Sequence, residues 1–335
     1  MATTLAEAKL NTQDKIDVAV IDEFRKSSDI ADRMTFDDAA SPVGGDTLTY
    51  SYRRLLTERG AAFRALNTEY VPENVTTVLK TVELKPLGGS FQVDRVVAKL
   101  GPAASGAVNL NLTQLVKSAR AKLADAVING DVAVDANGFD GLSKILTGST
   151  TEYLPLNNGV TTGYVDWTVI NDKASALAAQ VHIDNWLSAM DGAPDVIYGN
   201  RMTLALFKKI AAWADQLDKT TDAFGRPVTS YNGIPLIDLL TKAGSNTAVI
   251  PLASKDTDGA GSGGTITGLG DLFAVRYGLD GFHGASVLGG SLVSTYLPDF
   301  TTPGAVKTGE VEIGPVAPVL KASKAAAVFR NIKTA

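Results

Sequence analysis

The sequence predicts an α+β fold: an N-terminal arm and an extended β-hairpin, then a long helix, a compact α+β domain and a strand-rich end. Three observations predict this. Residues 73–99 alternate apolar and polar side chains at strand period. Residues 111–129 carry an apolar stripe at helical spacing. The length of 335 residues allows two or three compact subregions. Because strands and helices occur partly in separate runs, an α+β arrangement is favoured.

The first element is an amphipathic arm from Leu5 to about Ser28. Its apolar residues fall roughly at helical spacing among acids and bases: Leu10, Ile16, Val20, Ile21 and Phe24. Turn formers over residues 41–46 end this region, and a strand is predicted at Thr47 to Tyr52. The acids Asp37 and Asp38 are interpreted as solvated, because nothing in the sequence predicts a buried pocket around them.

The second element is a long hairpin between Glu73 and Lys99. We predict that Pro86 to Gly89 form its turn, between two arms in which apolar and polar residues alternate. Both arms are rich in charged residues, and isolated two-stranded ribbons are marginal in water. The hairpin therefore needs a partner surface.

The third element is a helix from Asn111 to Asn129. Its apolar stripe includes Leu115, Ala119 and Leu123, and Asn111 with Gln114 resembles a capping box at its start. Gly130 is expected to end the helix. A tight turn with the sequence DANGFDG follows, from Asp135 to Gly141.

The remaining elements form a compact α+β part and a strand-rich end. The expected helices and strands are Asn171–Met190 (helix), Asp195–Tyr198 (strand), Asn200–Asp218 (helix), Ile234–Leu240 (strand) and Ala248–Leu252 (strand). From Thr265 onward the chain is expected to be mainly extended. Trp167, Trp186 and Trp213 are expected to pack in the core or between subunits.

Catalytic and metal-binding patterns are weak. The chain has no cysteine, and its two histidines, His182 and His283, are interpreted as satisfied surface or packing residues. Gly259, Gly261 and Gly264 match the dinucleotide fingerprint, but no strand leads directly into them and an extended segment follows. We therefore expect no catalytic residue, no cofactor and no metal site. A nucleotide-using enzyme at this glycine loop is the alternative.

Charge is distributed unevenly along the chain. The net charge is −5, which argues against a dedicated nucleic-acid binder. Residues 1–50 hold five basic and ten acidic side chains, whereas residues 51–100 hold eight basic and five acidic. The arm and the hairpin region could attract each other between subunits, or both could be solvated surfaces.

Several stretches, in their order along the chain, resemble one family. They are VIDEFRKSSDIADRMTF before TLTYSYRR, then EYVPENVTTVLKTVELKPLGGSFQVDRVV, LVKSARAKLADAVINGD with NGFDGL, APDVIYGNRMTLALFKKI with NGIPLIDL, and AAAVFRNI. Together they resemble a tailed-phage major capsid protein with the HK97-type fold, over nearly the whole chain. The resemblance implies an N-terminal arm, an extended β-hairpin loop, a long spine helix with a peripheral β-sheet and a compact axial α+β domain.

The resemblance also implies a domain division. Residues 1–46 would be the arm, 47–100 the extended loop with its flanking strands, and 101–155 the spine helix with the peripheral domain. Residues 156–295 would be the axial domain, and residues 296–335 would return as strands to the peripheral and axial domains.

The function implied by the resemblance is structural. Hexamers and pentamers of this chain would form an icosahedral shell around packaged double-stranded DNA, without sequence-specific DNA binding and without a membrane. The shell would be the capsid of a virion assembled in the cytoplasm of a host bacterium. Scaffolding, portal and decoration proteins are further conceivable partners. The alternative is an encapsulin-like compartment that encloses cargo enzymes.

Inter-subunit contacts are expected around the extended loop. The candidates are Arg53, Arg54, Arg59 and Arg64 for ion pairs with a neighbour, and Lys80 and Lys85 as loop lysines. In some members of the family a loop lysine is crosslinked to a neighbour's asparagine. The sequence identifies neither that asparagine nor a promoting acid here, so no crosslink is predicted.

Overall fold

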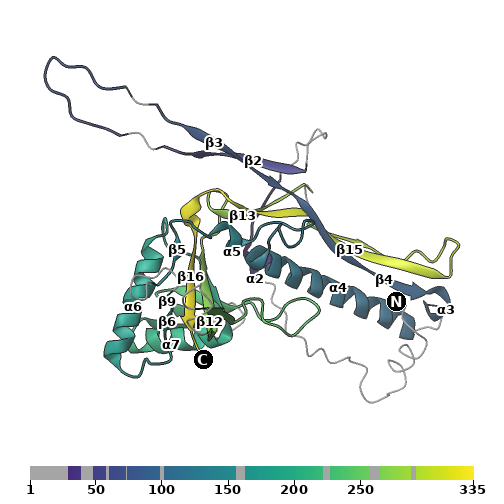
Figure 1. The fold of residues 1–335 in the computed structure, drawn as a ribbon. Coiled ribbons are helices and arrows are strands. Elements are labelled where there is room, and N and C mark those ends of the chain that lie inside the picture. Colours follow the sequence, from purple (N-terminus) through teal and green to yellow (C-terminus); the bar gives the residue numbers. More distant parts are fainter. Residues whose placement is uncertain are drawn as a thin grey trace.

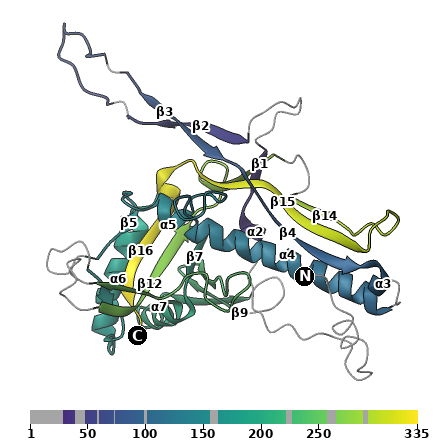
Figure 2. The same ribbon diagram turned by 45° about the vertical axis from the view of Figure 1, so that its right-hand side comes forward.

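The computed structural model describes residues 29–38, 48–57, 60–72, 74–98, 102–155, 163–221, 227–256, 265–287 and 292–335. The predicted arm helix at residues 5–28 and the glycine loop at residues 259–264 lie outside the described residues. The described chain forms two large sheets with helices packed on them, and a separate two-stranded hairpin that projects from this body in both views (Figures 1 and 2).

The first sheet has five strands in the order β1-β13-β15-β14, with β4 also paired to β15. These strands are β1 (Phe36–Asp38), β4 (Lys85–Asp94), β13 (Phe282–Ser286), β14 (Val293–Tyr296) and β15 (Val306–Leu320). The long helix α4 (Pro102–Asn129) lies along β4 and β15 (Figure 1). Two short helices, α2 (Asp29–Arg33) and α3 (Arg95–Ala98), contact α4 as well.

The second sheet has nine strands, in the order β5-β16-β12-β7-β10-β9-β8, with β11 paired to β12 and β6 to β16. Its strands are β5 (Glu152–Tyr153), β6 (Val165–Asp166), β7 (Val196–Gly199), β8 (Leu217–Thr221), β9 (Pro227–Tyr231), β10 (Ile234–Asp238), β11 (Ala253–Asp256), β12 (Thr265–Val275) and β16 (Ala326–Lys333). Helices α6 (Lys173–Ser188) and α7 (Arg201–Trp213) pack on it, while α5 (Leu142–Ile145) follows the DANGFDG turn.

The core has two main clusters. One joins α4 to both large sheets and includes Leu123, Ile128 and Phe282. The other lies between the nine-stranded sheet and helices α6 and α7, where Trp167 and Trp186 are fully buried. The expectation that these two tryptophans pack in the core is confirmed.

The predicted hairpin turn at Pro86 to Gly89 is wrong. These residues lie inside β4, which continues from β3 (Thr77–Glu83) and pairs antiparallel with β15, from Lys85 opposite Val316 to Asp94 opposite Val306. The glycines serve close packing: a Cβ at Gly88 would stand 2.5 Å from the Val311 carbonyl oxygen, and one at Gly89 2.6 Å from Leu115 Cδ1. The true hairpin joins β3 to β2 (Thr49–Leu55).

Three other boundaries differ from expectation. Helix α4 starts at Pro102, where proline suits a first helical turn, so Asn111 and Gln114 lie inside the helix and form no capping box. Helix α7 stops at Trp213, because Asp215 takes a left-handed conformation (φ 56°) before β8 begins. Residues 248–252 are not a strand, although a single β-bridge joins Ala248 to Thr241.

Candidate functional site

The β2–β3 hairpin projects from the body of the described chain (Figures 1 and 2). Its strands pair in register from Thr49 opposite Glu83 to Leu55 opposite Thr77. A last rung joins Leu56 to Thr76 through the Leu56 N–H, which donates to the Thr76 carbonyl at 2.8 Å. Beyond it, residues 60–72, 74 and 75 belong to no strand, and they form the open end at the upper left of Figure 1.

The tip of this loop is a defined turn. The Thr68 N–H donates to the Ala65 carbonyl at 3.3 Å, and Asn67 has a left-handed conformation (φ 65°) that asparagine tolerates well. The Arg64 guanidinium donates to the Thr68 carbonyl at 3.0 Å and lies 5.3 Å from the centre of the Tyr70 ring. The tip therefore has local order although the body does not support it.

Several large apolar side chains along this loop are exposed, with no cover from the described part of the chain. Phe63 is 108% exposed, Leu66 91% and Val71 84%. Scattered exposed apolar residues are ordinary, but a contiguous group marks an interaction surface. We call the side chains of Phe63, Leu66, Tyr70 and Val71 the tip patch.

The base of the hairpin is attached to the five-stranded sheet by a small apolar cluster. Leu84 is buried against Ala285, Ala317 and Val319 of β13 and β15, with Tyr50, Tyr52 and Val82 packed around them. We call this group the hairpin-base cluster. It explains why the short polar ribbon keeps its strands paired: its lower end covers apolar side chains of the body.

Polar contacts hold the same base. The Tyr52 hydroxyl donates to the Leu320 carbonyl at 2.9 Å, and the Arg54 guanidinium donates to the carbonyls of Leu320 and Lys321 at 2.6 and 2.9 Å. The Tyr50 hydroxyl donates to the Asp37 carboxylate at 2.7 Å. These bonds orient the hairpin on the last residues of β15.

Asp37 is therefore not simply solvated, which corrects the sequence-based interpretation. The hydrogen bond from Tyr50 and the Lys321 ammonium, 3.6 Å away, lower the pKa of the Asp37 carboxyl from its ordinary value. Sequence reasoning missed this contact because Asp37 and Lys321 are far apart in the chain.

The six predicted contact residues have different environments. Arg54, Lys80 and Lys85 line one cleft of about 530 Å³ between the hairpin base and the turn at residues 132–145. Arg54 is already engaged with the carbonyls of β15, and Lys85 forms an ion pair with Glu83 at 2.9 Å. The side chains of Lys80 and Arg53 are exposed, Arg64 lies at the tip, and Arg59 lies outside the described residues.

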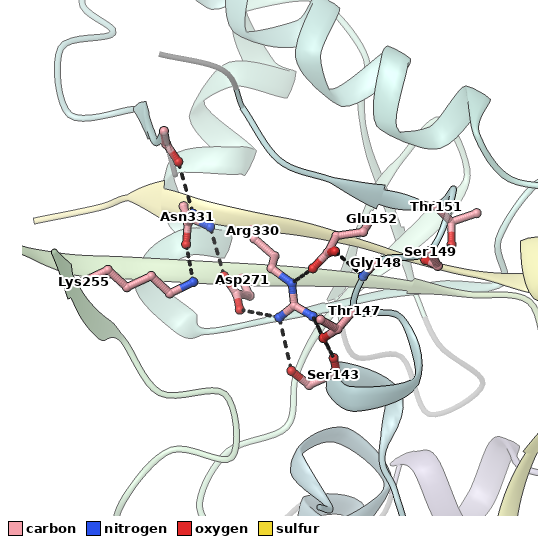
Figure 3. A network of polar contacts seen from close by, with 11 residues as sticks. Ser143, Thr147, Gly148, Ser149, Thr151, Glu152, Lys255, Asp271, Arg330 and Asn331 are labelled. Atoms are coloured by element: carbon pink, nitrogen blue, oxygen red, sulfur yellow. Dashed lines mark hydrogen bonds and ion pairs between the residues drawn. The ribbon is translucent and has the colours of Figure 1, made fainter. Parts of the chain in front are cut away.

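A nearly buried network of charged and polar groups lies around Arg330 in the described chain. Arg330 of β16, whose side chain is 10% exposed, pairs with Glu152 and donates to the Ser143 carbonyl at 2.7 Å and to Thr147 Oγ1 at 3.1 Å (Figure 3). Asp271 accepts from Arg330 at 3.4 Å and from the Asn331 N–H at 3.0 Å. Because these groups satisfy one another, the network has no free group to offer a substrate.

The two histidines have different outcomes: His182 on α6 is satisfied, as expected, and His283 is not. His182 accepts or donates a 2.7 Å hydrogen bond with the Tyr153 hydroxyl. His283 lies in β13 and is fully buried, so it is a packing residue as expected, but neither ring nitrogen has a hydrogen-bond partner among the described residues, so the prediction that it is satisfied is wrong.

The described residues contain neither a cluster of metal-ligating side chains nor a helix suited to crossing a membrane. No group of three or more His, Cys, Asp or Glu side chains is placed to hold a metal ion. Among the described helices, α4 included, none has both the length and the apolar character needed to cross a membrane.

Comparison with known proteins gives matches by structure alone. No protein-family model matches the chain, and no curated protein matches its sequence. The holo-SrpI encapsulin of Synechococcus elongatus matches with a TM-score of 0.61 and 14% identity, over 100% of this chain and 97% of that one. A protein of Mycobacterium phage Bobi matches at 0.56 and 13%, over 99% of both chains.

A third match is the capsid of a native GTA particle, with a TM-score of 0.55 and 12% identity, over 98% of this chain and 97% of that one. At such identities the likeness is one of fold. The predicted α+β class and the HK97-type fold are confirmed, and the similarity runs along essentially the full length of the chain.

Proposed function

We propose that this chain, which has the HK97-type fold, is the structural subunit of a closed shell, a major capsid protein that assembles from copies of itself. The observation that carries the proposal is the uncovered tip patch on a projecting hairpin. Burying a phenylalanine or leucine side chain contributes roughly 1.5–3 kcal/mol. A loop that exposes several such residues is best explained by a second subunit that covers them.

The contact we propose is between unlike surfaces. The tip patch of one subunit would lie on the body of a neighbour, so that the two partners contribute different residues. Such head-to-tail contacts generate closed rings when the rotation between subunits closes. Hexamers and pentamers, arranged as an icosahedral shell around packaged double-stranded DNA, are the assembly that this arrangement supports best. The DNA would be enclosed without sequence-specific binding.

Within this scheme, the basic side chains of the hairpin have graded roles. Arg53 and Lys80 are exposed and are proposed to pair with acids of a neighbour, as is Arg64 at the tip. Arg54 and Lys85 are engaged within the chain, so their contribution to a neighbour's contact would be secondary. Arg59 belongs to the same set by its position in the sequence.

A second candidate function is an encapsulin-like compartment that encloses cargo enzymes. The observation that favours it is the structural match to an encapsulin, whose TM-score of 0.61 exceeds those of the matched phage and GTA chains that we compared, 0.56 and 0.55. Both candidates are non-enzymatic shells. They differ in what they enclose.

Location, further partners and domain roles follow from the capsid proposal. The shell would be part of a virion assembled in the cytoplasm of a host bacterium, with scaffolding, portal and decoration proteins as further partners. The domain division at residues 46, 100, 155 and 295 is part of the same proposal.

The test is expression of the full chain in bacteria, with light scattering and electron microscopy of the purified product. Closed particles or rings of five and six subunits are expected. Only monomers or dimers, across salt and protein concentrations, would contradict both candidates. Genome neighbours then separate the two: portal, terminase and tail genes favour the capsid, and a cargo enzyme gene favours the compartment.

A further inference from the structure

His283 occupies an unusual position for a titratable side chain. It lies in β13 between β1 and β15, its exposure is 0%, and neither ring nitrogen is hydrogen-bonded. A buried polar group without a partner is costly, so such a group calls for an explanation. The chain has only two histidines, and the other one, His182, is on α6.

The ring of His283 is covered by the hairpin. Its neighbours two positions along β13 and opposite on β15, Ala285 and Val319, belong to the hairpin-base cluster. Side chains alternate along a strand, so His283 faces the same side of the sheet, away from Phe282 in the main core. The Tyr50 ring of β2 stands edge-on to the imidazole, with 5.8 Å between ring centres. If the hairpin base lifted, His283 would meet water.

Charged groups surround this position from each packed element. Asp37 follows Phe36 on β1, Lys321 follows β15, and Asp280 precedes β13, while β2 contributes the Tyr50 hydroxyl. Burial lowers the pKa of His283, and the Lys321 ammonium lowers it further. The carboxylates of Asp37 and Asp280 and the backbone of Gly281 oppose that shift only in part. The imidazole therefore takes up a proton less readily while the hairpin covers it than when it is exposed.

We propose that His283 is a pH-sensitive element that weakens the attachment of the hairpin base to the body when it becomes protonated. The imidazolium requires water or a counter-ion, and no carboxylate of the described residues is hydrogen-bonded to the covered ring. Lifting the base provides water. Protonation and release of the hairpin are therefore linked.

Protonation is expected to release the hairpin base and not to disrupt the five-stranded sheet, because different contacts stabilise the two. His283 pairs with Val319 of β15, its neighbour Gly284 pairs with Phe36 of β1, and Phe282 beside it is anchored in the main core. The hairpin base is held by a few side chains. The bond from Tyr50 to Asp37 is directly at risk, because an imidazolium nearby would compete for the Asp37 carboxylate and repel Lys321.

The sign of the pH dependence follows from the lowered pKa. The pKa of His283 is lower when the hairpin is attached than when it is released, where it has the ordinary value of about 6.5. As the pH falls below about 6.5, protonation therefore favours the released state. Attachment is at full strength above that pH. Below it, the ratio of released to attached hairpin rises by up to about tenfold per pH unit, until the pKa of the attached state is reached.

Release of the hairpin base occurs within a single chain and does not depend on shell assembly. Hydrogen–deuterium exchange of the full, unassembled chain tests it, with rates at pH 7.5 and 5.5 corrected for intrinsic exchange. Peptides covering β2 and β3 are expected to lose protection by up to about tenfold at pH 5.5, because the released ribbon is marginal alone. Peptides of β12 and β16 should not change.

Matched variants test whether His283 causes the pH-dependent loss of protection. In His283→Gln and His283→Phe the pH-dependent loss of protection should disappear, whereas His182→Gln should retain it. If the loss persists in both His283 variants, or disappears in His182→Gln, the proposal is wrong. It is equally wrong if the wild-type hairpin keeps its protection at pH 5.5.

Should both His283 variants fail to fold, a second measurement on the native sequence decides. NMR titration of the two histidine rings should find the pKa of His283 below 6.5, and the variant Tyr50→Ala should move it back toward that value by uncovering the ring. An unchanged His283 titration in Tyr50→Ala would overturn the link to the hairpin.

Discussion

The hairpin and the nine-stranded sheet are both built of strands, but they place their large side chains in opposite environments. Phe329 of β16 is fully buried and contacts the rings of Tyr153, Trp167 and Trp186 at 4.8–5.9 Å between centres. Phe63 of the hairpin tip touches no comparable core and is 108% exposed. One region completes its packing within the chain, whereas the other is complete only with a partner.

The arginines of the two regions show the same contrast. Arg330 is enclosed by acceptors from β5, β12 and the segment around α5 (Figure 3). Arg53 on the hairpin is exposed. The lesson is that substitutions in the nine-stranded sheet should cost stability, and substitutions in the hairpin should cost assembly.

The largest difference between the two regions is expected when one phenylalanine in each is replaced by alanine. Phe329→Ala should lower the free energy of unfolding by about 3–5 kcal/mol, because it removes buried area and leaves a cavity. Phe63→Ala should change it by less than about 0.5 kcal/mol, yet reduce particle yield. Urea denaturation and light scattering measure the two effects. Equal losses of stability would refute the contrast.

A second pair compares charges. Arg330→Ala should cost about 3–5 kcal/mol, because the buried Glu152 carboxylate loses its partner. Arg53→Ala should leave stability within about 0.5 kcal/mol of the native chain. Arg330→Lys serves as a control, since it keeps the charge but loses the branched donor geometry. The comparison would fail if Arg330→Ala unfolded at the same denaturant concentration as the native chain.

A smaller free-energy change is expected at the hairpin base, where the exposed hairpin packs on the buried body. Tyr50→Phe removes the hydrogen bond to Asp37 and should weaken the attachment by about 1.5–3 kcal/mol, as for a bond to a charged group. The lowered pKa of Asp37 means that its contribution is present above the ordinary carboxyl pKa and is lost as the pH falls through the lowered value.

Hydrogen exchange of β2 and β3 measures this contribution, and Tyr70→Phe at the tip is the matched control. In the native chain the acid-dependent loss from Asp37 should begin below its ordinary carboxyl pKa, about 4, whereas the loss from His283 should begin below about 6.5. If β2 and β3 of Tyr50→Phe were as protected from hydrogen exchange as those of the native chain, the hydrogen bond from Tyr50 to Asp37 would not contribute to the attachment.

The smallest effect on folding is expected for charge reversal at the tip. Arg64→Glu should leave the melting temperature nearly unchanged, because the side chain is exposed and bonds only within its own turn. It should impair assembly, since like charges would meet in the proposed contact. Unchanged particle yield across ionic strengths would argue against a role for Arg64 between subunits.

Local features of the fold were predictable from the sequence. The helix predicted from Asn200 by its apolar spacing is capped by Asn200, whose side chain accepts from the Met202 N–H at 3.0 Å. The helix at Asn171–Met190 was located by its apolar spacing, and Asp172 caps it.

The candidate site was predictable only in part. The polar ribbon indicated that a projecting element needed a partner, but the tip patch lies upstream of the predicted hairpin. Phe63 and Leu66 carry no distinctive signal, because isolated apolar residues in a polar stretch are found in cores as often as on surfaces. Their exposure follows from the distance of the loop from the body.

The type and approximate extent of most elements follow from the amino-acid sequence, since helical and strand periods are local properties of the chain. Which strand pairs with which depends on the folded chain as a whole. An alternating segment is compatible with many partners, so β3 and β4 looked like two arms of one hairpin. The match of β4 to β15, and of β2 to β3, depends on contacts distant in sequence, and so does the burial of His283 beneath Tyr50.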